Sequence, residues 1–330
     1  MSKRYVKRYS ELYEYLNRAL KEIRPLQGEP FKHLMKRKLT ASYQIVVNEL
    51  KGVLEALRDI EASGAFYIEL FKAFTGLDVS NLVVNVKSRL NVAKKVYSWT
   101  LDELKEAETR KDIIRVFKAG VGRLLSIYRR IDREVALVKE FLKEASKMPD
   151  VRGDYVIVIA GVPQVGKSTI LSKLTSAKPE IGTYPFTTKT LIAGHIDIEP
   201  YGRIVLVDSP GILDTPIEEK NIIEYKAVLA IKHLADHVLF VFAYSPDFYY
   251  TLREQLNVYE SIKRLLGDKP ITVLLNKVDL LEQGELDAIL REIEACTGVK
   301  PLPISALTGY NLDYLKKYIV DVFMERKRSL

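Results

Sequence analysis

The 330-residue sequence contains one cysteine, Cys296, and only four histidines. A single cysteine excludes an internal disulfide framework and a Cys-based metal site within one chain, which is typical of proteins in a reducing compartment. The histidines, His33, His195, His233 and His237, lack metal-ligand spacing, so we expect them at the surface or at strand ends. These absences favour a cytoplasmic protein.

Long apolar runs are also missing. The longest, at residues 156–162 and 238–243, are much shorter than the roughly 20 residues that cross a bilayer. The first residues, Met-Ser-Lys-Arg-Tyr, lead into a polar segment without the apolar stretch of a signal peptide. We therefore expect no export and no stable insertion into a membrane, and we interpret the two runs as buried strands.

Positive charge is concentrated in the first half of the chain. Residues 1–150 contain 30 Lys and Arg against 20 Asp and Glu, whereas residues 151–330 contain 21 against 23. Such a bias suits a polyanionic partner, either nucleic acid or an anionic membrane surface, although a solvated helix face is the alternative. The length and the Pro- and Gly-containing link at 148–154 predict two domains, 1–150 and 151–330.

Apolar residues of the first half recur every three or four positions. Between residues 39 and 60 this spacing predicts one long helix with a core-facing stripe. The same pattern over 109–147 predicts a single helix of about ten turns. Thr109 is its expected N-cap, and Pro149 cannot continue it.

Further helices are expected over residues 10–24 and 81–104. Several amphipathic helices must bury their stripes against one another, which predicts an all-α antiparallel bundle. An intermolecular coiled coil is the alternative. Gly64, Gly76 and the turn-like Asp78 favour helical hairpins within one chain.

The second half begins with a strand, a glycine-containing loop and a helix. The apolar run 156–160 precedes Gly-Val-Pro-Gln-Val-Gly-Lys-Ser at 161–168, and a helical pattern follows to residue 176. In this P-loop pattern backbone N–H groups surround a phosphate at a helix N-terminus, while the lysine reaches the β- and γ-phosphates and the serine hydroxyl ligates Mg²⁺. The predicted nucleotide-binding residues are Gly161, Gln164, Val165, Gly166, Lys167, Ser168 and Thr169.

A second phosphate-related motif, Asp-Ser-Pro-Gly at 208–211, follows the strand 204–207. Its carboxylate can bind Mg²⁺ through water, and the glycine N–H can meet the γ-phosphate. Tyr-Pro-Phe-Thr-Thr at 184–188 is the expected first switch, in which Thr188, or alternatively Thr187, completes the magnesium shell. The predicted catalytic residues are Lys167, Thr188 and Gly211, and the predicted metal ligands are Ser168, Thr188 and Asp208.

The base is indicated by Asn-Lys-Val-Asp at 276–279, after the strand 271–275. Guanine presents two adjacent donors that one carboxylate accepts together. Adenine lacks both, so a buried Asp279 would be left unpaired, a penalty that reaches ~10⁴-fold. GTP is therefore preferred to ATP. The predicted guanine-binding residues, including the Ser-Ala-Leu loop whose backbone N–H meets the guanine O6, are Asn276, Lys277, Asp279, Ser305, Ala306 and Leu307.

Strands and helices alternate from residue 155 to a closing helix at 311–328. This order predicts an α/β, doubly wound and mostly parallel sheet, with ligand-binding loops at the carboxyl ends of the strands. The predicted fold is thus an all-α helical bundle followed by an α/β P-loop G domain.

Several of these segments resemble the Nog (nucleolar G-protein) family of the Obg–Nog GTPases, in a short archaeal-type form. The resemblance rests on Ala-Lys-Pro-Glu-Ile at 177–181 together with the three motifs at 184–188, 208–211 and 276–279. Lys-Ala-Gly-Val-Gly-Arg at 118–123, with Met-Pro at 148–149, is similar to the family's helical N-terminal domain.

The resemblance implies a GTPase that uses GTP/GDP and Mg²⁺. It also implies action on the large ribosomal subunit precursor, with the helical domain contacting ribosomal RNA and ribosomal proteins. Gln164 replaces the Asn that relatives often have there, and which is associated with potassium stimulation, so dependence on K⁺ stays open. Because the resemblance is to a short form, we expect the protein to lack the long C-terminal extension of eukaryotic members.

Hydrolysis also needs an oriented water, commonly held by a Gln just after the Asp-x-x-Gly motif, and an arginine finger. The chain has Ile212 at that position, which predicts slow intrinsic hydrolysis until a partner completes the site. Two alternatives stay open: a GTPase switch that acts on a protein or membrane partner without RNA, and a guanine-binding scaffold without turnover.

Overall fold

The computed structural model describes residues 6–175, 178–245 and 247–329. It divides the chain into two compact units, Met1–Ser146 and Lys147–Leu330. Ala177, which belongs to the segment that resembles the Nog family, lies outside the described residues.

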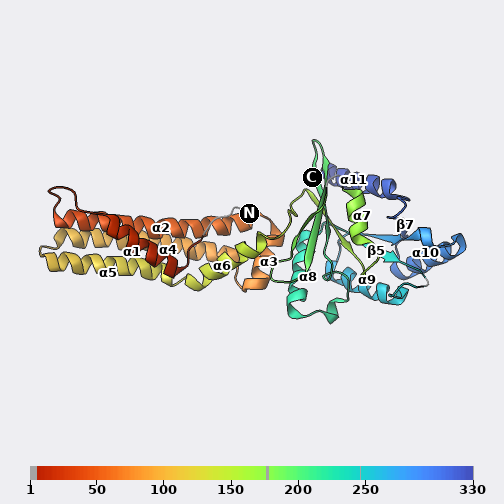
Figure 1. Ribbon diagram of the computed structural model, residues 1–330, viewed down its shortest axis with the longest axis horizontal. Coiled ribbons are helices and arrows are strands. Elements are labelled where there is room, and N and C mark those ends of the chain that lie inside the picture. The colour runs from red at the N-terminus through yellow and green to blue at the C-terminus, as the bar shows by residue number, and fades with distance from the viewer. Residues whose placement is uncertain (1–5, 176–177, 246, 330) are drawn as a thin grey trace. The chain divides into compact units, whose positions relative to one another are not determined.

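The first unit is all-helical in its described residues. Figure 1 shows α1, α2, α4 and α5 running side by side, and α2, α4 and α5 contact one another. The predicted all-α bundle is therefore confirmed. Its helices are α1 (Tyr9–Glu22), α2 (Phe31–Ala62), α3 (Ala65–Thr75), α4 (Val79–Glu106), α5 (Arg110–Arg129) and α6 (Asp132–Ala145).

Local capping explains where two of these helices, α4 and α5, begin. The Asp78 carboxylate accepts a hydrogen bond from the Asn81 N–H (2.9 Å), and the Thr109 hydroxyl accepts one from the Asp112 N–H (3.1 Å). Both side chains satisfy a backbone donor that the first helical turn leaves unpaired. Thr109 is therefore the N-cap that its sequence predicts.

The expected single helix over 109–147 is wrong, because the helix is interrupted at Arg130 and Ile131. Helix α5 ends at Arg129, and α6 begins at Asp132. The Asp132 carboxylate accepts hydrogen bonds from Arg8 Nε (2.9 Å) and Nη2 (2.7 Å) and from the Tyr9 N–H (2.7 Å). These bonds lower the pKa of Asp132. Ile131 stays buried, so the apolar stripe continues across the break and periodicity does not detect it.

The second unit contains a seven-stranded sheet in the order β2-β3-β4-β1-β5-β6-β7. The pairs β2–β3 and β3–β4 are antiparallel, and the remaining pairs are parallel. The sheet is thus mostly parallel, as predicted. Its strands are β1 (Tyr155–Ala160), β2 (Glu180–Thr183), β3 (Thr190–Ile198), β4 (Gly202–Asp208), β5 (His237–Ala243), β6 (Ile271–Asn276) and β7 (Leu302–Pro303).

Helices cover this sheet. Strands β1 and β5 are buried along their whole length, as expected for parallel strands covered on both faces. Strands β2, β3 and β4 lie on one side of β1 in the sheet, and β5, β6 and β7 lie on the other. The strand order therefore reverses at β1, which is where sheets of this type bind ligands. The helical elements are α7 (Lys167–Leu174), α8 (Ile222–Leu234), α9 (Leu252–Leu266), α10 (Gln283–Thr297), α11 (Leu312–Ser329) and two short 3-10 helices, η1 (Ile217–Glu219) and η2 (Val278–Leu280).

Candidate nucleotide-binding site

The loop between β1 and α7 requires glycine at two positions. A Cβ on Gly161 (φ 137°) would lie 2.4 Å from the Val241 carbonyl oxygen, and one on Gly166 (φ 97°) would lie 2.4 Å from Asn276 Nδ2. Gln164 also has a left-handed backbone, at φ 67°. The glycines therefore allow the loop to approach β5 and Asn276 closely. Because α7 begins at Lys167, the loop leads into a helix N-terminus, where backbone N–H groups favour an anion.

Lys167 lies over this loop. Its ammonium donates hydrogen bonds to the Gly161 carbonyl (2.7 Å) and the Val162 carbonyl (2.9 Å). Burial lowers the pKa of Lys167, while the carboxylates of Asp208 and Asp214 oppose that shift. The loop thus holds a buried cation beside two carboxylates.

Two of the three predicted Mg²⁺ ligands, Ser168 and Asp208, lie together. The Ser168 hydroxyl donates to Asp208 Oδ2 at 2.6 Å, and Asp208 is fully buried at the end of β4. Burial raises the pKa of Asp208, and its Oδ1 has no hydrogen-bond partner. Mg²⁺ prefers hard oxygen ligands such as carboxylates, so a buried, unpartnered carboxylate oxygen beside a hydroxyl fits this ion.

The first-switch segment forms a tight turn between β2 and β3. The Thr187 hydroxyl donates to the Tyr184 carbonyl (2.9 Å) and accepts a hydrogen bond from the Lys189 N–H (3.1 Å). Thr188 is exposed. Because the turn already engages the Thr187 hydroxyl, this geometry favours Thr188 as the threonine that reaches a metal, which stays a prediction.

Gly211 is enclosed by two charged residues that the sequence motifs do not identify. Its N–H donates to Asp214 Oδ2 at 2.7 Å, and its φ is 82°. A Cβ on Gly211 would lie 2.7 Å from Lys189 Cδ, and Lys189 Nζ forms an ion pair with Glu224 Oε1 of α8 at 3.2 Å. The sequence signals these residues only by position. Lys189 directly follows Thr188, and Asp214 lies three residues after Gly211.

Asn276 connects the phosphate loop to the base-specific loops. Its Nδ2 donates to the Val165 carbonyl at 2.7 Å, and its Oδ1 accepts from the Ala306 N–H at 2.9 Å. Asn276 is buried at the end of β6. The side chain therefore fixes the P-loop against the Ser-Ala-Leu loop at 305–307. Ser305 in that loop is buried and Leu307 is exposed.

The expectation that Asp279 is buried is wrong. Asp279 is exposed at the surface of η2, just after Lys277, whose backbone is left-handed (φ 65°). The Lys277 ammonium lies 5.0 Å from the centre of the Phe248 ring. An exposed carboxylate is hydrated, so discrimination against adenine requires the bound base itself to exclude water from Asp279.

Metal-binding groups and membrane-spanning helices were also searched for among the described residues. The described residues contain no group of three or more His, Cys, Asp or Glu side chains that could hold a metal ion by themselves. Across the same residues, no helix combines the length and the apolar character needed to span a bilayer. His237 lies at a strand end, as expected, but it is buried there.

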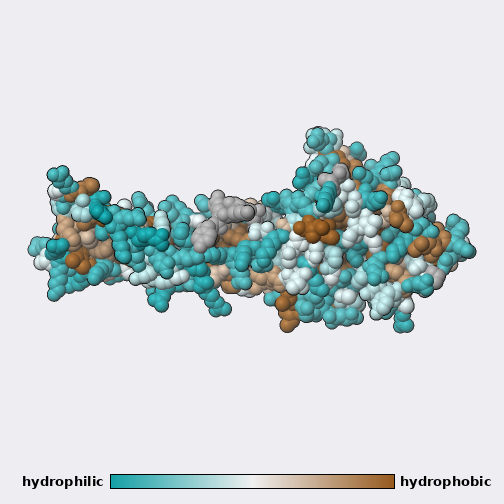
Figure 2. All heavy atoms as spheres, in the orientation of Figure 1, coloured by the Kyte–Doolittle hydropathy of each residue, from teal (hydrophilic) through white to brown (hydrophobic). Residues whose placement is uncertain are grey.

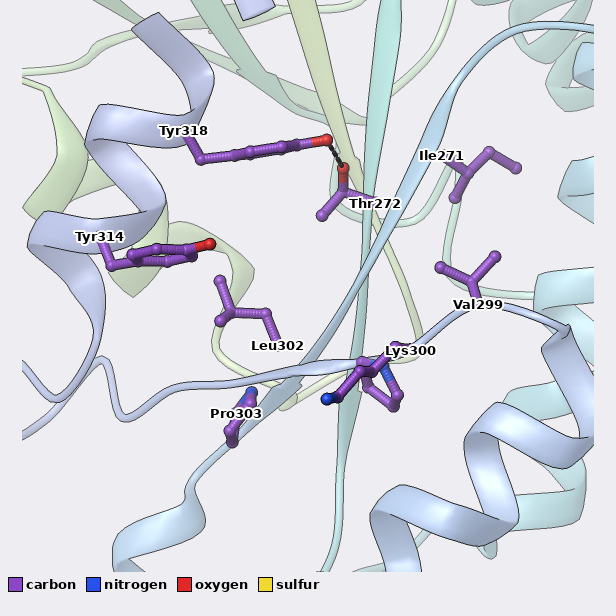
Figure 3. Close-up of a pocket in the computed structure, with 9 residues that line it drawn as sticks. Ile271, Thr272, Val299, Lys300, Leu302, Pro303, Tyr314 and Tyr318 are labelled. Atoms are coloured by element: carbon purple, nitrogen blue, oxygen red, sulfur yellow. Dashed lines mark hydrogen bonds between the residues drawn. The ribbon is translucent and has the colours of Figure 1, made fainter. Parts of the chain in front are cut away.

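A hollow lies elsewhere on the second unit. It has a volume of about 450 Å³, and Figure 3 shows Tyr314 and Tyr318 of α11 facing it. Its lining includes Ile271 and Thr272, at the start of β6 and thus at the opposite end of the strand from Asn276. The carboxyl ends of parallel strands bind ligands in this type of sheet, so we do not assign the nucleotide to this hollow.

The strand, P-loop and helix, together with the buried Asp208 and Asn276 at the carboxyl ends of β4 and β6, define a P-loop GTPase domain. Comparison with known sequences agrees. Residues 156–277 match the model for 50S ribosome-binding GTPases, and residues 6–152 match the NOG1 N-terminal helical domain.

Individual relatives place the chain within one family. An uncharacterised protein of Methanocaldococcus jannaschii is 35% identical over 240 residues, 72% of this chain and 67% of that protein. Nucleolar GTP-binding protein 1 of Drosophila melanogaster is 31% identical over 262 residues, 78% of this chain but 40% of that protein. The chain belongs to the Nog family of GTPases.

The chain thus spans less than half the length of the Drosophila relative. Among solved structures, a putative nucleolar GTP-binding protein 1 from Plasmodium falciparum is 26% identical. That match covers 53% of this chain and 88% of the other, with a TM-score of 0.43.

Proposed function

We propose that this protein is a magnesium-dependent GTPase switch that acts in assembly of the large ribosomal subunit. The observation that carries this proposal is the convergence of Lys167, the Ser168–Asp208 pair and Asn276 at the carboxyl ends of β1, β4 and β6, in a chain that also has the family's helical domain.

Each part of the site has a proposed role. Backbone N–H groups of the P-loop bind the phosphates, and Lys167 neutralises the β- and γ-phosphates. Ser168, Thr188 and Asp208 would hold Mg²⁺, which neutralises phosphate charge when bound. The Gly211 N–H binds the γ-phosphate. The guanine-binding residues are Asn276, Lys277, Asp279, Ser305, Ala306 and Leu307.

Hydrolysis by the protein alone is proposed to be slow. Ile212 is fully buried and apolar, so it cannot orient the attacking water as a glutamine does. A partner or another switch residue must complete the site.

Single-turnover release of phosphate from GTP by the isolated protein tests this proposal. We expect a slow rate that Lys167→Ala abolishes, since the variant loses the cation at the β- and γ-phosphates. Rapid hydrolysis by the isolated wild-type protein would contradict the slow rate. The absence of hydrolysis under all conditions, with GTP still bound, would favour a scaffold without turnover.

The ribosomal role is supported by the relatives' names and by charge. Residues 1–150 have 30 Lys and Arg against 20 Asp and Glu, and Figure 2 shows hydrophilic residues over most of the visible face of the helical unit. We propose that this cytoplasmic protein contacts ribosomal RNA or ribosomal protein through that unit.

Cosedimentation with large-subunit precursors, and separately with anionic liposomes, distinguishes this proposal from a membrane or protein partner. RNA docking releases counterions, so binding to precursors should weaken steeply as salt rises, by roughly 10³-fold or more between 50 and 200 mM salt if about six phosphates are contacted. Binding to liposomes alone, or salt-independent binding to precursors, would favour the alternative partner.

A further inference from the structure

The Gly211 N–H, which the proposed function assigns to the γ-phosphate, already has an acceptor within the chain. It donates to Asp214 Oδ2 at 2.7 Å. Asp214 is 8% exposed, so this bond is shielded from water. One N–H makes one good hydrogen bond at this distance, so a γ-phosphate oxygen and the Asp214 carboxylate compete for the same donor.

The competition is also electrostatic. Asp214 lies close enough to Lys167 and Lys220 to stabilise both cations. Lys220 is held nearby through a hydrogen bond from its Nζ to the Thr215 hydroxyl at 2.7 Å. The γ-phosphate needs Lys167 as well, and two anions in one partly buried site repel each other. Binding of a γ-phosphate therefore requires the carboxylate to leave the Gly211 N–H.

The structure offers Asp214 space to move. A cavity of about 130 Å³ beside it is lined by residues that include Val162, Thr215 and Tyr250. Lys189, which is paired with Glu224 at the start of α8, fills the space that a Cβ on Gly211 would take. Displacement of Asp214 from Gly211 thus frees the loop at 211–214. Lys189 connects this loop to the first switch, which it directly follows, and to α8, through its ion pair with Glu224.

We propose that Asp214 is a specificity-determining residue that occupies the γ-phosphate position at Gly211 and thereby weakens the binding of GTP relative to GDP. GDP has no γ-phosphate, so it leaves the Asp214–Gly211 bond intact. GTP must break that bond, and the displaced loop then differs between the two nucleotide states. This inference rests on the proposed nucleotide site and adds the residue that biases it toward GDP.

The test compares the affinities of GDP and of a non-hydrolysable GTP analogue, both with Mg²⁺, for the full chain. Asp214→Ala removes both the acceptor and the charge, so the affinity ratio of analogue to GDP should rise about tenfold. Asp214→Asn keeps a side-chain oxygen but removes the charge, and should give a smaller rise. Asp287→Asn removes one negative charge from an exposed residue of α10, away from the cavity beside Asp214, and should leave the ratio unchanged.

A ratio that stays unchanged or falls in both Asp214 variants would overturn the proposal, provided that thermal unfolding and GDP affinity show a folded protein. A loss of hydrolysis at an unchanged ratio would also overturn it, because Asp214 would then act in the chemical step. Failure of the wild-type chain to bind either nucleotide would instead contradict the proposed function, so the two outcomes are distinguishable.

Discussion

Asp279 is the residue at which the choice of base can be tested directly. Its carboxylate is expected to accept hydrogen bonds from the guanine N1–H and 2-amino groups. Asp279→Asn places an amide N–H₂ donor against one of these donors, so we expect GDP affinity to fall at least about 100-fold. Xanthine has a carbonyl in place of the 2-amino group, so the same variant should bind xanthosine diphosphate more tightly than the wild type does.

Equilibrium titration with fluorescent GDP and xanthosine diphosphate measures both affinities. Asp287→Asn, an equivalent change at an exposed residue of α10, is the matched control and should alter neither. A GDP affinity for Asp279→Asn within about threefold of the wild type would show that Asp279 does not read the base.

The sequence predicted which residues form the nucleotide site better than it predicted the hydrogen bonds between them. The motifs identify Lys167, Ser168, Asp208 and Asn276 because spacing after a buried strand fixes them at strand ends. The motifs do not predict that Asn276 links the Val165 carbonyl to the Ala306 N–H, which joins loops far apart in the chain. Nor do they identify Asp214, because a carboxylate three residues after a glycine has no general spacing rule.

At the scale of elements, the crossing of α4 and α5 depends on one glycine. A Cβ on Gly120 would lie 2.3 Å from Thr100 Cγ2, and the Thr100 hydroxyl is fixed by donating to the Val96 carbonyl at 2.7 Å. We expect Gly120→Ala to destabilise the helical unit by about 1–3 kcal/mol, because overpacking forces the two helices apart. Denaturant unfolding monitored by helical circular dichroism measures this change.

Gly122, two residues further along α5, provides the control. A Cβ there would meet no atom within 4 Å, so Gly122→Ala should stabilise the unit by about 0.5–1 kcal/mol through better helix propensity. If the two variants changed the free energy of unfolding by the same amount and sign, close packing at Gly120 would not explain its presence.

Elements with a long regular pattern were predictable, and short or interrupted ones were not. Helix α2 and strands β1 and β6 follow from periodicity or from apolar runs. Helix α3 was missed because it lies between the turn residues Gly64 and Gly76, and the break before Asp132 was missed because Ile131 stays buried. The antiparallel β2–β3 pair was also not predicted, since the short, partly exposed β2 has no apolar run.

At the scale of the molecule, the two units have separate cores, so unfolding need not be a single two-state transition. Their stabilities should also respond differently to pH. In the second unit, His237 is buried between the Tyr155 hydroxyl, 3.0 Å from Nδ1, and the Thr272 hydroxyl, 2.8 Å from Nε2. Burial lowers the pKa of His237 to about 4, from an ordinary value of 6.5.

Because the folded state holds His237 neutral, the unfolded state binds more protons between pH 6.5 and pH 4. The stabilisation is fully present above pH 6.5 and is lost progressively as pH falls toward 4, by an amount on the order of 3 kcal/mol. In calorimetric scans, the transition of the second unit should therefore shift to lower temperature over this range. His237→Gln should flatten that dependence, whereas His233→Gln, at an exposed position of α8, should preserve it. A pH dependence between 5 and 6.5 that survives His237→Gln would mean that other buried groups set the acid sensitivity of the GTPase unit.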